Sequence, residues 1–67
     1  MKKNICFDLR GYRRRNDLTQ EEIAKRIGVQ QSAVSQFELN GENVNIATIN
    51  KIANALNVDA MELLKEV

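Results

Sequence analysis

The fold is decided by residues 19–40, which read TQEEIAKRIGVQQSAVSQFELN. Two short helical patterns flank Gly28, and apolar residues recur in each of them at spacings of three or four positions. Thr19 can cap the first pattern, and Glu22, three residues later, completes a capping-box signature. Gly28 supplies the left-handed conformation that ends this helix. The stretch therefore predicts two helices joined by a short turn, which is the helix-turn-helix unit, over about residues 20–39.

The second helix of this unit has an outward face without charge, made of polar residues and one leucine. If Val34 and Phe37 face inward, helical geometry turns four residues outward: Ser32, Ser35, Gln36 and Leu39. Gln31 then lies at the flank of this face. A glutamine amide offers one donor and one acceptor, which match adenine N7 and N6 in the major groove of DNA. Glutamines are also ordinary helix formers on solvated faces, but the surrounding motif favours base readout.

Three further helices complete the predicted bundle. The first is indicated by residues that share one helical face, namely Ile5, Leu9 and Tyr12. Another begins near Asn45, with five inward positions: Ile46, Ile49, Ile52, Ala53 and Leu56. The last starts at a second capping box, Asp59 with Glu62. The sequence thus predicts an all-α, compact five-helix bundle that occupies residues 1–67 as a single domain.

Length and composition limit the classes of protein to which this chain can belong. With 67 residues and 43% hydrophobic content, the chain can form one small domain with an aliphatic core. The single cysteine, Cys6, excludes an internal disulfide, and the absence of histidine argues against an enzyme and against a metal or other cofactor. No apolar run approaches the roughly 18 residues of a membrane helix, so we expect a cytoplasmic protein with no membrane partner.

The stretch LTQEEIAKRIGVQQSAVSQFE resembles the Cro/lambda-repressor-type helix-turn-helix, also called the xenobiotic-response-element family. The resemblance continues through TINKIANALNV and MELL, so it covers roughly residues 7 to 64. It implies a five-helix DNA-binding domain, commonly a dimeric transcriptional regulator, whose third helix enters the major groove. Carried over by position, it assigns the base contacts to Gln31, Ser32 and Gln36.

The resemblance also places Gln20 beside a DNA phosphate, where the positive end of a helix favours an anion. We interpret five more residues as phosphate contacts: Gln30, Ser35, Asn43, Asn45 and Lys51. The clustered Arg10, Arg14 and Arg15 are either a solvated helix face or additional phosphate contacts. Glu42 departs from the family pattern because it places negative charge after the third helix.

Two charged residues fall on inward faces. Glu38 lies near Val34 and Phe37, and Arg13 shares the apolar face of the first helix, where an unpaired charge is costly. In the family these two positions form an ion pair. We therefore predict that Arg13 and Glu38 pair as a structural link between helices. No single role is assigned to Leu39: it could touch the sugar–phosphate edge of DNA or a thymine methyl, or simply cover apolar surface.

These features favour a sequence-specific repressor that binds double-stranded DNA as a homodimer on a near-palindromic operator. Two-fold symmetry would then place half-site centres about 10 bp apart. Dimer contacts are assigned to Met61, Leu64 and Val67, which could equally be ordinary core. Because 67 residues form one small domain, we expect no small-molecule effector site. The alternative is an antitoxin or other protein-interaction module on the same scaffold, which the near-neutral net charge of +1, Leu39 and Glu42 favour.

Overall fold

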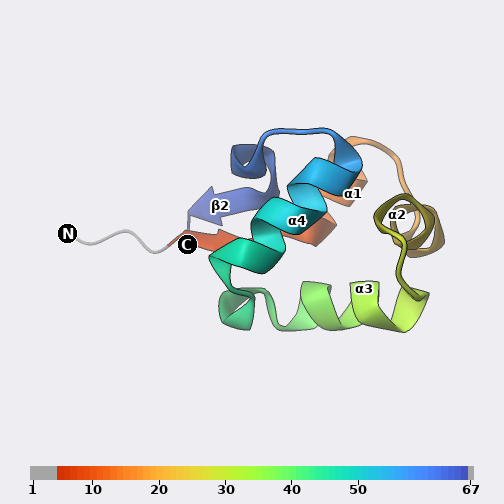
Figure 1. Cartoon of the computed structure of the whole chain (residues 1–67), viewed down its shortest axis with the longest axis horizontal. Helices are drawn as coiled ribbons and strands as arrows, with labels where there is room; N and C mark the ends of the chain where they lie inside the picture. The colour runs from red at the N-terminus through yellow and green to blue at the C-terminus, as the bar shows by residue number, and fades with distance from the viewer. Residues whose placement is uncertain (1–4, 67) are drawn as a thin grey trace.

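The computed structural model describes residues 5–66, which form four α-helices, two 3-10 helices and a two-stranded antiparallel ribbon (Figure 1). In chain order the elements are β1 (Ile5–Phe7), α1 (Leu9–Arg15), α2 (Gln20–Ile27), α3 (Gln31–Leu39), η1 (Gly41–Asn43), α4 (Ile46–Leu56), η2 (Ala60–Leu63) and β2 (Leu64–Glu66). In Figure 1, α3 runs along one side of the molecule, and the ribbon lies at the opposite end from α2.

The predicted start and end of α2 are confirmed. The Thr19 hydroxyl accepts a hydrogen bond from the Glu22 backbone N–H at 3.1 Å, and the Glu22 carboxylate accepts one from the Thr19 N–H at 2.9 Å. Gly28 ends the helix with φ of +84°, a conformation that costs glycine nothing. These local signals set the first and last residues of α2, and the chain turns after Gly28 to enter α3.

The prediction of five α-helices was wrong at the amino end. Ile5 does not continue α1 but lies in β1, paired with Glu66, and its side chain is exposed. The helix begins only after Asp8, whose carboxylate accepts a hydrogen bond from the Gly11 N–H at 3.2 Å. A Cβ on Gly11 would collide with this carboxylate, so glycine allows the cap to close.

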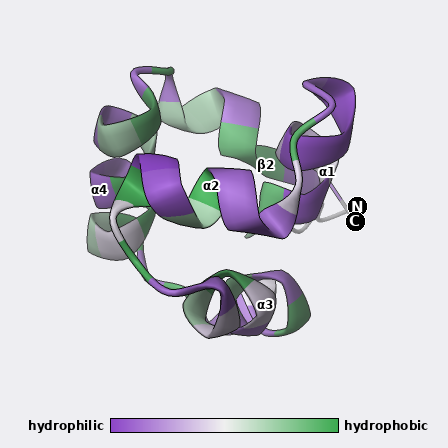
Figure 2. Ribbon diagram, turned by 90° about the vertical axis from the view of Figure 1, so that its right-hand side faces the viewer, coloured by the Kyte–Doolittle hydropathy of each residue, from purple (hydrophilic) through white to green (hydrophobic). Residues whose placement is uncertain are grey.

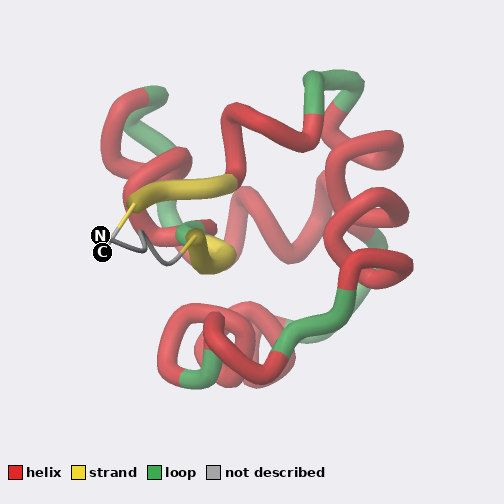
Figure 3. The backbone as a smooth tube through the Cα atoms, turned by 90° about the vertical axis from the view of Figure 1, so that its left-hand side faces the viewer, coloured by secondary structure: helices red, strands yellow, loops and turns green. Residues whose placement is uncertain are grey.

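The prediction was also wrong at the carboxyl end. Asp59 accepts from the Met61 N–H, so it caps the 3-10 helix η2 and no capping box with Glu62 forms. The Leu63 carbonyl accepts from the Asp8 N–H at 2.6 Å, and the chain then enters β2 beside β1 (Figure 3). A segment this short gains little from helix formation, whereas pairing with β1 satisfies its backbone groups.

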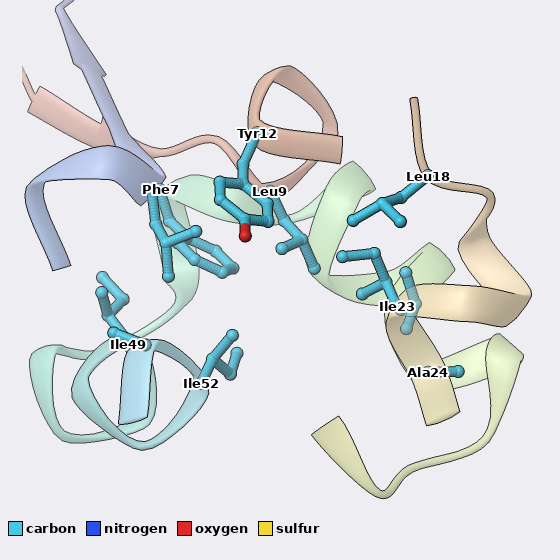
Figure 4. Packing of buried hydrophobic residues seen from close by; sticks show 11 residues of the cluster. Phe7, Leu9, Tyr12, Leu18, Ile23, Ala24, Ile49 and Ile52 are labelled. Carbon is cyan, nitrogen blue, oxygen red and sulfur yellow. The ribbon is translucent and has the colours of Figure 1, made fainter. Parts of the chain in front are cut away.

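The core is largely aliphatic and includes Phe7 and Tyr12 (Figure 4), and Phe37 packs against it. Its largest fully buried side chains are Leu9, Ile23, Val34 and Leu63. Phe7 and Phe37 meet edge to face with ring centroids 6.3 Å apart, which joins β1 to α3. Ile46, expected to face inward, is 72% exposed because it is the first residue of α4, where the helix has not yet reached the core.

Hydrophobic and hydrophilic segments alternate along α2, as expected for a helix with one buried face (Figure 2). Val29, an apolar residue, lies on the surface of the turn that follows this helix. Between residues 5 and 66, no helix combines the length and the apolar character that crossing a bilayer requires.

Candidate nucleic-acid interface

The outer face of α3 carries no exposed charge. Gln31, Ser32, Gln36 and Leu39 are exposed and Ser35 is half-buried, while Val34 is fully buried beneath them. The helix contains a single ionisable residue, Glu38, which points inward. The structure therefore brings the three residues assigned to base contacts onto one helix face, beside an exposed leucine.

Glu38 lies at the centre of a hydrogen-bond network that joins α1, α2 and α3. Its side chain is only 1% exposed. Arg13 donates from Nε to Oε2 at 2.7 Å and from Nη2 to Oε1 at 3.2 Å. Arg10 Nε and Gln20 Nε2 also donate to Oε1, at 3.3 and 3.0 Å. The carboxylate thus has four donors, and the structure brings Arg13 and Glu38 into a bidentate ion pair.

The surroundings of Glu38 act on its pKa in opposite directions. Burial alone raises the pKa of this carboxyl, but the hydrogen bonds from Arg13, Gln20 and Arg10 outweigh burial and hold the pKa below its usual value. The ionised form of Glu38 therefore stabilises the folded protein.

This lowered pKa predicts a loss of stability in acid. A carboxyl whose pKa is lower in the folded state stabilises the protein above its unfolded pKa of about 4.3, and this contribution is lost as the pH falls through the folded value. The free energy of unfolding should therefore drop as the pH is lowered from 7 to below 4. Urea titrations of the wild type and of Glu38→Gln test this, since the variant should lose less stability over that range. An equal acid dependence in the two proteins would contradict the assignment.

Gln20 faces the interior of the network as well as the surface. It is the first residue of α2 and is half-buried. Its Nε2 donates to Glu38, and its Oε1 accepts from Gln31 Nε2 at 3.4 Å. On the same face of α3, Gln36 Oε1 accepts from Asn40 Nδ2 at 3.1 Å. Both glutamines assigned to base contacts therefore already have an amide partner.

The remaining phosphate candidates lie at helix starts or on α4. Gln30 is the residue before α3 and makes no capping bond with its side chain, whereas Asn45 caps α4 by accepting from the Thr48 N–H at 2.8 Å. Asn43 is exposed in η1. Lys51 is exposed on α4 and lines one groove with Gly28, Val29 and Phe37, so it lies beside the turn between α2 and α3.

Sequence reasoning missed the scaffold roles of two arginines and one asparagine. Arg15 donates to the Glu62 carbonyl at 2.7 Å, which ties α1 to η2, and Arg10 contributes to the Glu38 network. Asn40, which follows the last residue of α3, donates from Nδ2 to Gln36 Oε1. The spacing of Gln36 and Asn40, at i and i+4 on a helix, was a signal that could have revealed this bond.

The geometry defines a class of protein. Helix α2, the turn at residues 28–30 and helix α3 form a helix-turn-helix whose second helix exposes an uncharged polar face. A model of the family described as "Helix-turn-helix" matches residues 9–63. The chain belongs to the Cro/C1-type, or xenobiotic-response-element, helix-turn-helix family.

Several known proteins are similar to this chain. The antitoxin HipB of Escherichia coli strain K12 is 43% identical over 44 residues, which are 66% of this chain and 50% of HipB. The control protein C.SmaI of Serratia marcescens is 31% identical over 64 residues, which are 96% of this chain and 76% of that protein. A crystal structure titled as a HipB-O1-O2 complex superposes with a TM-score of 0.58 at 38% identity, covering 75% of this chain and 72% of that one. The match thus spans about half the length of the HipB antitoxins.

Proposed function

We propose that this protein is a sequence-specific repressor that binds a near-palindromic operator as a homodimer, with α3 in the major groove. The observation that carries the proposal is the uncharged outer face of α3. A face built for sequence-independent affinity would carry lysine or arginine against phosphates, whereas amides and hydroxyls discriminate between base edges. A DNA target also implies a cytoplasmic location. The similarity to a structure titled as a HipB-O1-O2 complex supports this function.

In this function Gln31, Ser32 and Gln36 read base edges. Phosphate groups of the DNA backbone are contacted by the residues around them: Gln20, Gln30, Ser35, Asn43, Asn45 and Lys51. Lys51 alone among these carries charge, and the net charge of the chain is only +1. Because non-specific affinity comes from neutralising phosphates, we expect weak binding to random DNA and a strong dependence on specific contacts and on dimerisation.

Gln31→Ala and Gln36→Ala should each relax the preference at a single base position by about 1–3 kcal/mol. The measurement is selection of bound DNA from a random pool, followed by binding constants for the winning site and its single-base variants. Lys51→Ala is the matched control, because loss of a phosphate contact weakens binding to all sequences alike. Preferences that stay unchanged in both glutamine variants would refute the assigned base contacts.

The proposed dimer surface lies around η2 and the ribbon. Met61 is 76% exposed, and it lines a surface depression with the apolar Ile5 and Leu64 and the charged Lys65 and Glu66. Val67, the third residue assigned to this surface, lies outside the described residues. Met61→Glu would place a charge in this surface, so it should weaken dimerisation and raise the fraction of monomer seen by sedimentation equilibrium. A variant that dimerises like the wild type would place the interface elsewhere.

A second candidate function is that of an antitoxin, which the 43% identity to HipB antitoxins favours. Leu39, 68% exposed on the outer face of α3, is an apolar residue that a protein partner could cover. Co-purification with the product of an adjacent gene in a fixed stoichiometry would support this function. Purification of the protein alone, when it is expressed together with its neighbouring genes, would argue against this function.

A further inference from the structure

We propose that Glu38 is a positioning residue for base readout, because it fixes through Gln20 the direction in which the Gln31 amide faces DNA. The inference rests on the proposed function, since it concerns how Gln31 would read a base. It gives the buried network a role in specificity in addition to its role in joining helices.

The first step is the fixed polarity of Glu38. An ionised carboxylate can only accept hydrogen bonds. Arg13 holds both of its oxygens, with Nε 2.7 Å from Oε2 and Nη2 3.2 Å from Oε1, and the side chain is 1% exposed. A guanidinium can only donate, so neither partner can exchange roles. The Glu38 carboxylate, held by Arg13, is therefore a hydrogen-bond acceptor of fixed orientation between the helices of the helix-turn-helix.

The second step is the orientation of Gln20. A glutamine amide can present either its oxygen or its nitrogen, and the two ends have nearly the same shape. Opposite Glu38 only the nitrogen is allowed, and Gln20 Nε2 donates to Oε1 at 3.0 Å. The Gln20 oxygen must then point away from Glu38, toward the start of α3. The carboxylate thus determines which end of the Gln20 amide, nearer the surface, acts as donor and which as acceptor.

The third step reaches Gln31. Its Nε2 donates to the Gln20 oxygen at 3.4 Å, and the opposite orientation would set two oxygens against each other. The relay therefore decides the order in which the donor and the acceptor of Gln31 face the groove. Adenine presents N7 and N6 in one order only, so an amide of fixed direction discriminates better than one that can flip.

Gln36 provides an internal contrast. Its oxygen accepts from Asn40 Nδ2 at 3.1 Å, but Asn40 is itself an exposed amide. Both side chains of that pair could turn together without an unsatisfied contact, since each amide has a donor end and an acceptor end. The direction of Gln36 is therefore not fixed, and changes at Glu38 should leave its base preference unaltered.

Two variants test the relay. Glu38→Gln replaces the acceptor by an amide that can turn either end toward Gln20. Gln20→Leu leaves the pair of Arg13 and Glu38 in place but removes both hydrogen bonds of the relay, so it remains informative even if Glu38→Gln fails to fold. Gln20→Leu also removes a proposed phosphate contact, which lowers affinity for all sequences alike. For this reason the readout is the ratio of affinities for sites that differ at one base pair.

We expect both variants, when folded, to lower discrimination at the base pair read by Gln31 by about three- to ten-fold, the equivalent of one modest hydrogen bond. The 3.4 Å length of the last link argues for this partial loss rather than a complete one. Discrimination at the Gln36 position should stay as in the wild type. Discrimination that is unchanged at the Gln31 position, or reduced equally at every position, would overturn the relay.

The outcome for Gln31→Ala separates this inference from the proposed function. If Gln31→Ala loses one base preference while Glu38→Gln and Gln20→Leu keep it, Gln31 reads a base but the relay does not orient it. If the wild type itself shows no preference among DNA sequences, the proposed function fails, and the relay fails with it.

Discussion

Arg13→Ala should lower the free energy of unfolding by about 3–5 kcal/mol, the usual cost of removing one partner of a buried ion pair. The variant leaves the Glu38 carboxylate, 1% exposed, with only Arg10 and Gln20 as donors. Glu38→Ala should cost less within that range, because Arg13 is 18% exposed and still donates to the Leu18 carbonyl at 3.2 Å. A domain of this size has a total stability of only ~3–10 kcal/mol, so either loss is large.

Chemical denaturation of the two variants and of the double variant Arg13→Met/Glu38→Leu measures these costs. The double variant fills the same space without charge, so it should recover much of the lost stability, as buried pairs replaced by apolar residues commonly do. If both single variants unfold at the same denaturant concentration as the wild type, the network does not hold the three helices together.

Leu63→Ala should destabilise the protein by about 2–5 kcal/mol, because the side chain is fully buried and the surrounding core can only partly collapse onto the space. Leu63 lies where η2 meets α1, and its carbonyl accepts from the Asp8 N–H. The cavity would therefore open at the junction that holds both strands of the ribbon.

Met61→Ala is the matched control on the same 3-10 helix. Met61 is 76% exposed, so its truncation should change stability by no more than about 0.5 kcal/mol in the monomer. Thermal and urea unfolding at low protein concentration compare the two variants without a contribution from dimerisation. Equal losses for Leu63→Ala and Met61→Ala would contradict the packing described for η2.

The helix-turn-helix could be predicted from the sequence because its signals are local. Thr19 and Glu22 cap α2 across three residues, and Gly28 alone specifies the left-handed turn. The burial of Val34 followed from helical periodicity, which in turn fixed the outward set on α3. Each of these features depends on residues within one or two turns of each other.

The ribbon could not be predicted, since it pairs Ile5 with Glu66 across nearly the whole chain. Each partner strand has only three residues, too few to show an alternating pattern. The spacing of Ile5, Leu9 and Tyr12 fitted a helix equally well. Asp8 was the local signal against that reading, because it stands directly before Leu9 and caps α1.

The candidate site shows the same division. The residues on the outer face of α3 could be assigned from helix geometry together with a family resemblance. The links from Glu38 through Gln20 to Gln31 could not, because they depend on the angle between α2 and α3 and on side-chain directions across 18 and 11 positions of sequence. The result is a carboxylate that belongs to the scaffold yet is linked through Gln20 to Gln31 on the proposed reading edge.

In the proposed function, helix α3 recognises base sequence and does not merely bind the charged phosphates of DNA. This recognition is tested most directly by the ratio of binding constants for the selected operator and for a shuffled sequence of equal length, measured near physiological salt. We predict a ratio of about 10³ or more, with weak binding to the shuffled DNA, as expected for a specific complex formed by a nearly neutral protein. Tight binding to both DNAs, with a ratio near one, would contradict the account.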